Sequence, residues 1–166
     1  LNLIYVKELY KTFDGGNEFT KSITYNNFSS PVFCLTSDIC YRTDVRNANP
    51  YQAYIAKTSN GGLTWQDLHH SPSGRAITNI FYADENNGFI ITDGYLWKTV
   101  DKGYNWYSNF SPSQTVNSEL LYFINKDTGY VYDSDGNFST QNDGLMRTFD
   151  GGETWELVNN FDFLQN

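Results

Sequence analysis

One eight-residue pattern, Thr-x-Asp/Asn-x-Gly-x-x-Trp/Phe, occurs four times in this chain and constrains its fold more than any other feature. The copies begin at residues 12, 58, 99 and 148, so successive copies are 46, 41 and 49 residues apart. The fixed positions are Thr12, Asp14, Gly16 and Phe19; Thr58, Asn60, Gly62 and Trp65; Thr99, Asp101, Gly103 and Trp106; and Thr148, Asp150, Gly152 and Trp155. Such near-constant spacing indicates one supersecondary unit used repeatedly.

The chemistry of the octapeptide predicts a tight hairpin turn. An Asp at the third position can accept hydrogen bonds from backbone N–H groups of its own turn, and Gly at the fifth tolerates a positive φ. The Thr hydroxyl can brace the same turn, while the aromatic residue begins the next strand and is expected to be buried between repeats. A calcium or catalytic site is disfavoured, because each copy offers one carboxylate and the second copy has Asn60 instead.

A repeat of about 40 to 50 residues with strand-like sequence between the copies is typical of β-propeller blades. The composition agrees with an all-β fold, since aromatic residues make up 17% of the chain and 13 glycines supply turns. We therefore predict four-stranded antiparallel blades, with the octapeptide joining the third and fourth strands, C and D. The predicted strands are 3–12 and 18–25; 31–36, 39–43, 51–58 and 64–69; 76–83, 88–92, 95–99 and 105–110; and 118–124, 129–133, 144–148 and 154–158.

These strands divide residues 1–166, taken as a single repeat domain, into a partial blade and three complete blades. Residues 1–28 supply strands C and D of the partial blade, and residues 29–70, 71–111 and 112–166 form the others. Closed propellers typically have ~4 to 8 blades. The chain is therefore expected to form a partial propeller that needs further blades from its parent chain or from another chain.

The four octapeptides resemble the Asp-box, or bacterial neuraminidase repeat, of β-propeller proteins. The resemblance extends to residues 77–89, followed by 94–99, which are similar to the photosystem II assembly and stability factor branch of that family; residues 120–132 repeat the theme. It implies a β-propeller with the boxes between strands C and D, and it makes a role in binding or assembly an expectation. Phe19 in the first copy and Asn60 in the second depart from the family's pattern.

The two cysteines, Cys34 and Cys40, flank a short segment centred on Ser37. A hairpin there would place them opposite each other on antiparallel strands, within reach of a disulfide. Asp-box relatives often carry a similarly placed pair, and we favour the bridge over two buried free thiols. A disulfide implies an oxidising compartment, so we expect an extracytoplasmic protein: secreted, periplasmic or on the cell surface.

The charge balance limits the classes of partner. With 11 basic and 19 acidic residues the formal net charge is −8, which disfavours nucleic acid and anionic lipid. No run of ~18 apolar residues is present that could insert into a membrane. A protein partner is expected first and a glycan second, with no cofactor.

An enzyme remains the alternative hypothesis. Sialidases that share the box need three arginines to hold the substrate carboxylate, whereas this chain has only Arg42, Arg46, Arg75 and Arg147, and the last occupies a repeat position held elsewhere by lysine. Xyloglucanases use two separated carboxylates, and nothing in the sequence singles out such a pair. Adjacent histidines on a strand point in opposite directions, so the His69–His70 pair does not predict a metal site.

Blade topology places the loops at two ends, because successive turns of an antiparallel sheet alternate. The A-to-B turns and the octapeptides share one end, and the variable segments 42–50, 69–75, 111–117 and 134–143 lie at the other. Variable loops on a repetitive scaffold are where binding usually resides. The candidate binding face comprises Arg42, Asp44, Arg46, His69, His70, Arg75, Asp133, Asp135 and Asn137. We thus predict a noncatalytic, protein-binding propeller, with a fragment of a glycoside hydrolase or a glycan-binding propeller as the alternative.

Overall fold

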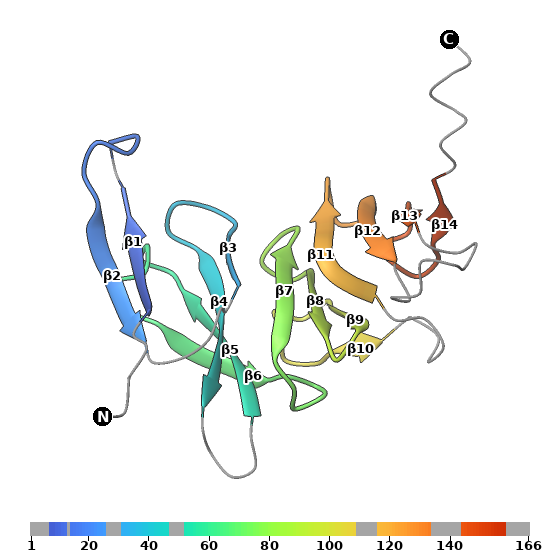
Figure 1. Ribbon diagram of the computed structural model, residues 1–166, viewed down its shortest axis with the longest axis horizontal. Helices are drawn as coiled ribbons and strands as arrows, with labels where there is room; N and C mark the ends of the chain where they lie inside the picture. The colour runs from blue at the N-terminus through green and yellow to red at the C-terminus, as the bar shows by residue number, and fades with distance from the viewer. Residues whose placement is uncertain are drawn as a thin grey trace. The chain divides into compact units, whose positions relative to one another are not determined.

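The computed structural model describes residues 7–12, 14–25, 31–46, 52–108, 116–133 and 144–158. Within these ranges the chain is all-β, with antiparallel strands and no helix (Figure 1). The first sheet is a two-stranded hairpin formed by β1 (Lys7–Lys11) and β2 (Thr20–Tyr25). Its two strands flank the first octapeptide, as predicted for strands C and D.

The remaining described strands form four-stranded sheets in which sequential strands are neighbours. One contains β3 (Val32–Cys34), β4 (Cys40–Arg46), β5 (Gln52–Thr58) and β6 (Gln66–His70). The next contains β7 (Ile77–Tyr82), β8 (Gly88–Thr92), β9 (Tyr95–Thr99) and β10 (Tyr107–Ser108). The last contains β11 (Val116–Phe123), β12 (Gly129–Asp133), β13 (Gly144–Thr148) and β14 (Glu156–Leu157). The predicted four-stranded antiparallel architecture, with an octapeptide between the third and fourth strands, is confirmed.

The chain forms two compact units, Leu1–Ile77 and Thr78–Asn166. In the first unit the core lies on β4 and β5, where Tyr41, Ile55 and Ala56 are fully buried. Burial alternates along much of β5, because its side chains point in turn to the two faces of the sheet.

In the second unit the most deeply buried strand is β8. All of its residues are buried, and Phe89, Ile90 and Ile91 have no exposed surface. The Phe89 ring stacks on Phe123 of β11 with centroids 3.6 Å apart, so two sheets of this unit meet through aromatic packing. Full burial of each such side chain contributes ~1.5 to 3 kcal/mol to folding.

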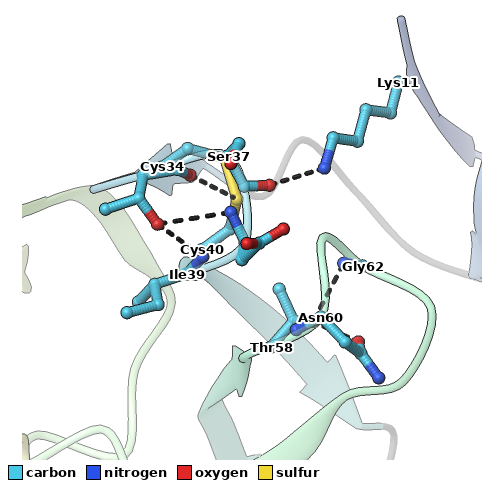
Figure 2. Close-up of a disulfide and its surroundings, with 10 residues drawn as sticks. Lys11, Cys34, Ser37, Ile39, Cys40, Thr58, Asn60 and Gly62 are labelled. Carbon is cyan, nitrogen blue, oxygen red and sulfur yellow. Dashed lines mark hydrogen bonds between the residues drawn. A yellow bond between two sulfur atoms is a disulfide. The ribbon is translucent and has the colours of Figure 1, made fainter. Parts of the chain in front are cut away.

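Cys34 and Cys40 form the predicted disulfide, with the two Cα atoms 4.0 Å apart and directly opposite in the β3–β4 register (Figure 2). The turn between them is closed by the Leu35 N–H, which donates to the Ile39 carbonyl at 2.9 Å. The bridge therefore fastens one A-to-B hairpin covalently.

The octapeptide aromatic residues are less buried than expected: Trp65, Trp106 and Trp155 are half-buried, and Phe19 is 61% exposed, which contradicts the expectation for the first copy. Each tryptophan stands just before the fourth strand of its sheet, which is an edge strand. Trp106 and Trp155 satisfy their indole N–H within the turn, by donating to the carbonyls of Gly103 and Gly152 at 3.1 Å.

Candidate functional site

The octapeptide turns are held by their own polar side chains. In the last copy, Thr148 Oγ1 accepts from the N–H groups of Asp150 and Gly152 at 3.3 and 2.9 Å, and it donates to Asp150 Oδ1 at 2.8 Å. The same three bonds are made by Thr12, Thr58 and Thr99. In the second copy the amide oxygen of Asn60 takes the place of a carboxylate oxygen.

The turn carboxylates are occupied by donors from the residues that follow. The hydroxyl and the backbone N–H of Thr154 bond to Asp150 at 2.5 and 2.9 Å and lower the pKa of that carboxyl to about 2. The pKa of Asp14 is lowered mainly by the Glu18 N–H, and that of Asp101 mainly by the Asn105 N–H. A general acid needs a pKa near the working pH, so these aspartates act as structural acceptors.

Both central positions of each turn have left-handed backbone, although the sequence predicted a positive φ only at the fifth. The φ angles are 66° and 88° at Gly61 and Gly62, and 67° and 89° at Lys102 and Gly103. The glycines at the fourth position of the other three copies, Gly15, Gly61 and Gly151, were the sequence signal that could have predicted a positive φ there. Lys102 carries a side chain in a conformation that disfavours one.

In each four-stranded sheet the octapeptide is tied to the A-to-B turn of the same sheet. The fourth-position N–H donates to a carbonyl of that turn: Gly61 to Asp38 at 2.9 Å, Lys102 to Asn86 at 3.1 Å, and Gly151 to Asp127 at 2.7 Å. The two turns thus form one uniform end of the sheet, here called the turn end.

A lysine just before the octapeptide also links neighbouring sheets within each unit. Lys11 Nζ donates to the Ser37 carbonyl at 2.5 Å (Figure 2), and Lys98 Nζ lies 3.2 Å from Glu153 Oε1. Arg147, at the same repeat position, instead pairs with Glu156 of its own sheet at 2.7 Å. These contacts explain the basic residue at this position as part of the scaffold.

The opposite end of the β3–β6 sheet, here called the loop end, carries a row of polar and aromatic side chains. Asp44, Tyr54 and His70 lie side by side in the register of β4, β5 and β6. The Tyr54 and His70 rings are tilted with centroids 4.5 Å apart, and Tyr54 Oη donates to Gln52 Oε1 at 3.1 Å. Because His70 is exposed and Tyr54 half-buried, the row faces solvent in part.

Arg42 does not belong to a loop, which corrects the prediction of an insertion beginning at residue 42. It lies within β4 with only 7% of its surface exposed, because its guanidinium sits 5.1 Å from the Trp65 ring centroid and 3.6 Å from the Asp44 carboxylate. Asp44 is likewise within β4, and its side chain is only 15% exposed. Arg42 is therefore a packing residue that cannot directly contact a large partner.

The other predicted binding residues are distributed as follows. Arg46 ends β4 opposite Gln52, His69 is half-buried on β6, and Arg75 is exposed in the turn after Ser71. Asp133 ends β12, opposite Gly144. Asp135 and Asn137 lie outside the described residues. The structure brings Asp44 and His70 together on one sheet.

Sequence reasoning missed Tyr54 and Gln52, which complete the row at the loop end. They stand opposite Asp44 and Arg46 in the β4–β5 register. That register depends on where β4 ends and β5 begins. The alternating pattern of residues 52–58 was the sequence signal that could have placed Gln52 and Tyr54 on β5.

In the described ranges, His, Cys, Asp and Glu side chains nowhere gather in a group of three that could ligate a metal ion. A helix capable of crossing a membrane is absent from the same part of the chain.

The strand order, the antiparallel registers and the repeated turns define an all-β protein of β-propeller type. No family model and no curated protein sequence matches the chain. Similar solved structures include YCF48 bound to a D1 peptide, with 18% identity and a TM-score of 0.56 over 76% of this chain and 38% of that one.

YCF48 from Cyanidioschyzon merolae is similar at 16% identity and a TM-score of 0.56, over 91% of this chain and 50% of that one. The GH74 enzyme of Niastella koreensis is similar at 16% identity and a TM-score of 0.55, over 74% of this chain and 21% of that one. At these identities the likeness concerns the fold. The chain spans half or less of the length of each.

Proposed function

We propose that this chain is a noncatalytic segment of an Asp-box β-propeller that binds a protein partner through its loop end. The observation that carries the proposal is the row formed by Asp44, Tyr54 and His70, with Arg75 exposed in the turn that follows. Mixed charge beside aromatic rings suits a specific, polar protein contact. The polar groups of the turn end, by contrast, are used in hydrogen bonds that hold the turns themselves together.

The comparison with YCF48 bound to a D1 peptide supports a peptide or protein as the ligand class. A net charge of −8 favours a neutral or basic partner. The disulfide supports an extracytoplasmic location. We further propose that residues 1–28, 29–70, 71–111 and 112–166 are successive blades, completed by blades from the parent chain or another chain.

The test uses the 166-residue chain and three fluorescent peptide mixtures of equal length: basic, neutral and acidic. Fluorescence anisotropy should show binding that is strongest for the basic or neutral mixture. His70→Ala and Arg75→Ala should each weaken binding by at least fivefold while leaving the melting temperature nearly unchanged, because both side chains are exposed. Leu63→Ala is the matched control, since Leu63 is 77% exposed at the turn end of the same sheet.

Two results would contradict this function. Weaker binding in Leu63→Ala, with none lost in His70→Ala or Arg75→Ala, would place binding at the turn end. Hydrolysis of sialosides or β-glucans, or binding of these glycans without any peptide binding, would favour the glycoside hydrolase or glycan-binding alternative.

A further inference from the structure

The A-to-B hairpins of the four-stranded sheets differ at one pair of equivalent positions. The last residue of the first strand and the first residue of the second are Tyr82 and Gly88 in one sheet and Phe123 and Gly129 in another. In the β3–β6 sheet the same pair is Cys34 and Cys40, which are likewise six positions apart. An aromatic residue opposite a glycine is thus replaced by a disulfide.

In the second unit the aromatic ring covers the glycine and reaches the octapeptide turn. A Cβ atom on Gly88 would fall 2.6 Å from the Tyr82 ring, and one on Gly103 would fall 2.9 Å from the Tyr82 hydroxyl. The Phe123 ring likewise lies over Gly129 and meets Trp155 edge-on, with centroids 6.1 Å apart. The ring therefore fills the space between its hairpin and the turn.

The disulfide is too small to fill the corresponding space in the first unit. A pocket of about 480 Å³ lies there, and the first hairpin contributes Tyr10 and Lys11 to its wall. Its lining also includes Val32, Cys34, Leu35, Cys40, Gly62 and Trp65. Figure 2 shows Lys11 reaching Ser37 of the bridged hairpin, with Gly62 on the same side of the hairpin in this view.

Trp65 differs from the other octapeptide tryptophans in the same region. Trp106 and Trp155 donate their indole N–H to the turn at 3.1 Å, whereas Trp65 Nε1 is buried without a hydrogen-bond partner among the described residues. The indole beside the pocket therefore lacks the bond that fixes its counterparts.

We propose that this pocket binds a tyrosyl side chain of a peptide ligand. A ring seated against the disulfide would restore the packing that Tyr82 and Phe123 provide in the second unit. Its hydroxyl would lie near Gly62, as the Tyr82 hydroxyl lies near Gly103. The volume is suitable, since dry cavities of ~150 Å³ bind benzene and ligand pockets span ~300 to 1,000 Å³. This site lies at the turn end, so it is independent of the proposed loop-end contact.

The test titrates the ¹⁵N-labelled 166-residue chain with N-acetyl-tyrosine N-methylamide and follows amide and indole resonances. The Trp65 indole and the Gly62 amide should shift, while Gly103 and Gly152, whose turns already pack against aromatic rings, should not. The phenylalanine analogue should bind more weakly, and the leucine analogue at least tenfold more weakly. Free p-cresol is the second probe, and it should bind no more tightly than the tyrosine derivative.

Variants at the bridge provide the matched comparison. Cys34→Phe with Cys40→Gly installs the ring and glycine of the other sheets, and it should reduce affinity at least tenfold while the melting temperature shows a folded chain. Cys34→Ser with Cys40→Ser leaves the space open and should retain binding within threefold.

Four results would overturn the proposal. They are unchanged Trp65 and Gly62 resonances, equal binding of the leucine analogue, undiminished binding in the folded ring-and-glycine variant, and tighter binding of p-cresol than of the tyrosine derivative. The last would identify a site for free phenols. If either double variant fails to fold, the wild-type resonances and the analogue series still decide the matter.

Discussion

Replacing Gly88 by Ala tests whether a ring and a glycine form a required pair at the A-to-B hairpin. The added Cβ would lie 2.6, 2.7 and 2.9 Å from three atoms of the Tyr82 ring. Carbon atoms pack best at ~3.5 to 4.0 Å, so the ring must move by roughly 1 Å. Tyr82 has no exposed surface, and its neighbours must therefore move with it.

Overpacking of this kind destabilises the folded chain by ~1 to 3 kcal/mol. Removing glycine's conformational freedom from the unfolded chain stabilises the fold by ~0.4 to 1 kcal/mol and offsets part of that loss. We expect a net loss of about 1 to 2 kcal/mol in the free energy of unfolding, measured by urea denaturation. In a Tyr82→Leu background the same substitution should cost less than half as much, because the ring is absent. Equal costs in the two backgrounds, or a stabilising Gly88→Ala, would refute the pairing of ring and glycine.

Three other predictions concern the turns and the bridge. Lys102→Gly should raise the free energy of unfolding by ~0.5 to 1 kcal/mol in thermal melts, because glycine accepts the φ of 67° without strain. The control is Lys57→Gly within β5, which should lower the free energy of unfolding because glycine weakens a strand interior. The folded pKa of Asp150, about 2, lies below its ordinary value of 3.8, so the stability that the ionised carboxylate contributes is present above pH 4 and is lost as pH falls towards 2. The melting-temperature difference between wild type and Asp150→Asn should therefore shrink over that range. A constant difference would contradict this prediction. Reducing the Cys34–Cys40 bridge should cost about 2 kcal/mol, the loop-closure value for so short a loop, and no change on adding a phosphine reductant would contradict this.

Strand positions were predictable because the octapeptide marks the same point in every repeat. Once the turn at 148–155 is placed, β13 and β14 must flank it, and alternation of apolar residues sets the strands before it. The facing positions of Cys34 and Cys40 followed from the same local reasoning, since two antiparallel strands so close in sequence are joined by a hairpin.

The candidate site was less predictable, because it depends on packing between distant residues. Arg42 looks like a solvated loop charge in sequence, yet the Trp65 ring and the Asp44 carboxylate bury it within the sheet. Tyr54 joins His70 only through the β5–β6 register, which contains an irregularity between Ile55 and Ala56. The pocket beside the disulfide is equally non-local, because it reflects a ring that neighbouring repeats have and this one lacks.

The exchange of a ring and a glycine for two cysteines also affects how such repeats can be recombined in evolution. A crossover inside the six-position hairpin would combine Cys34 with a glycine, leaving an unpaired thiol and an empty space, or a tyrosine with Cys40, forcing a side chain into its ring. Both residues must be inherited together. We therefore expect the two facing positions of this hairpin to be exchanged as a pair when repeats recombine.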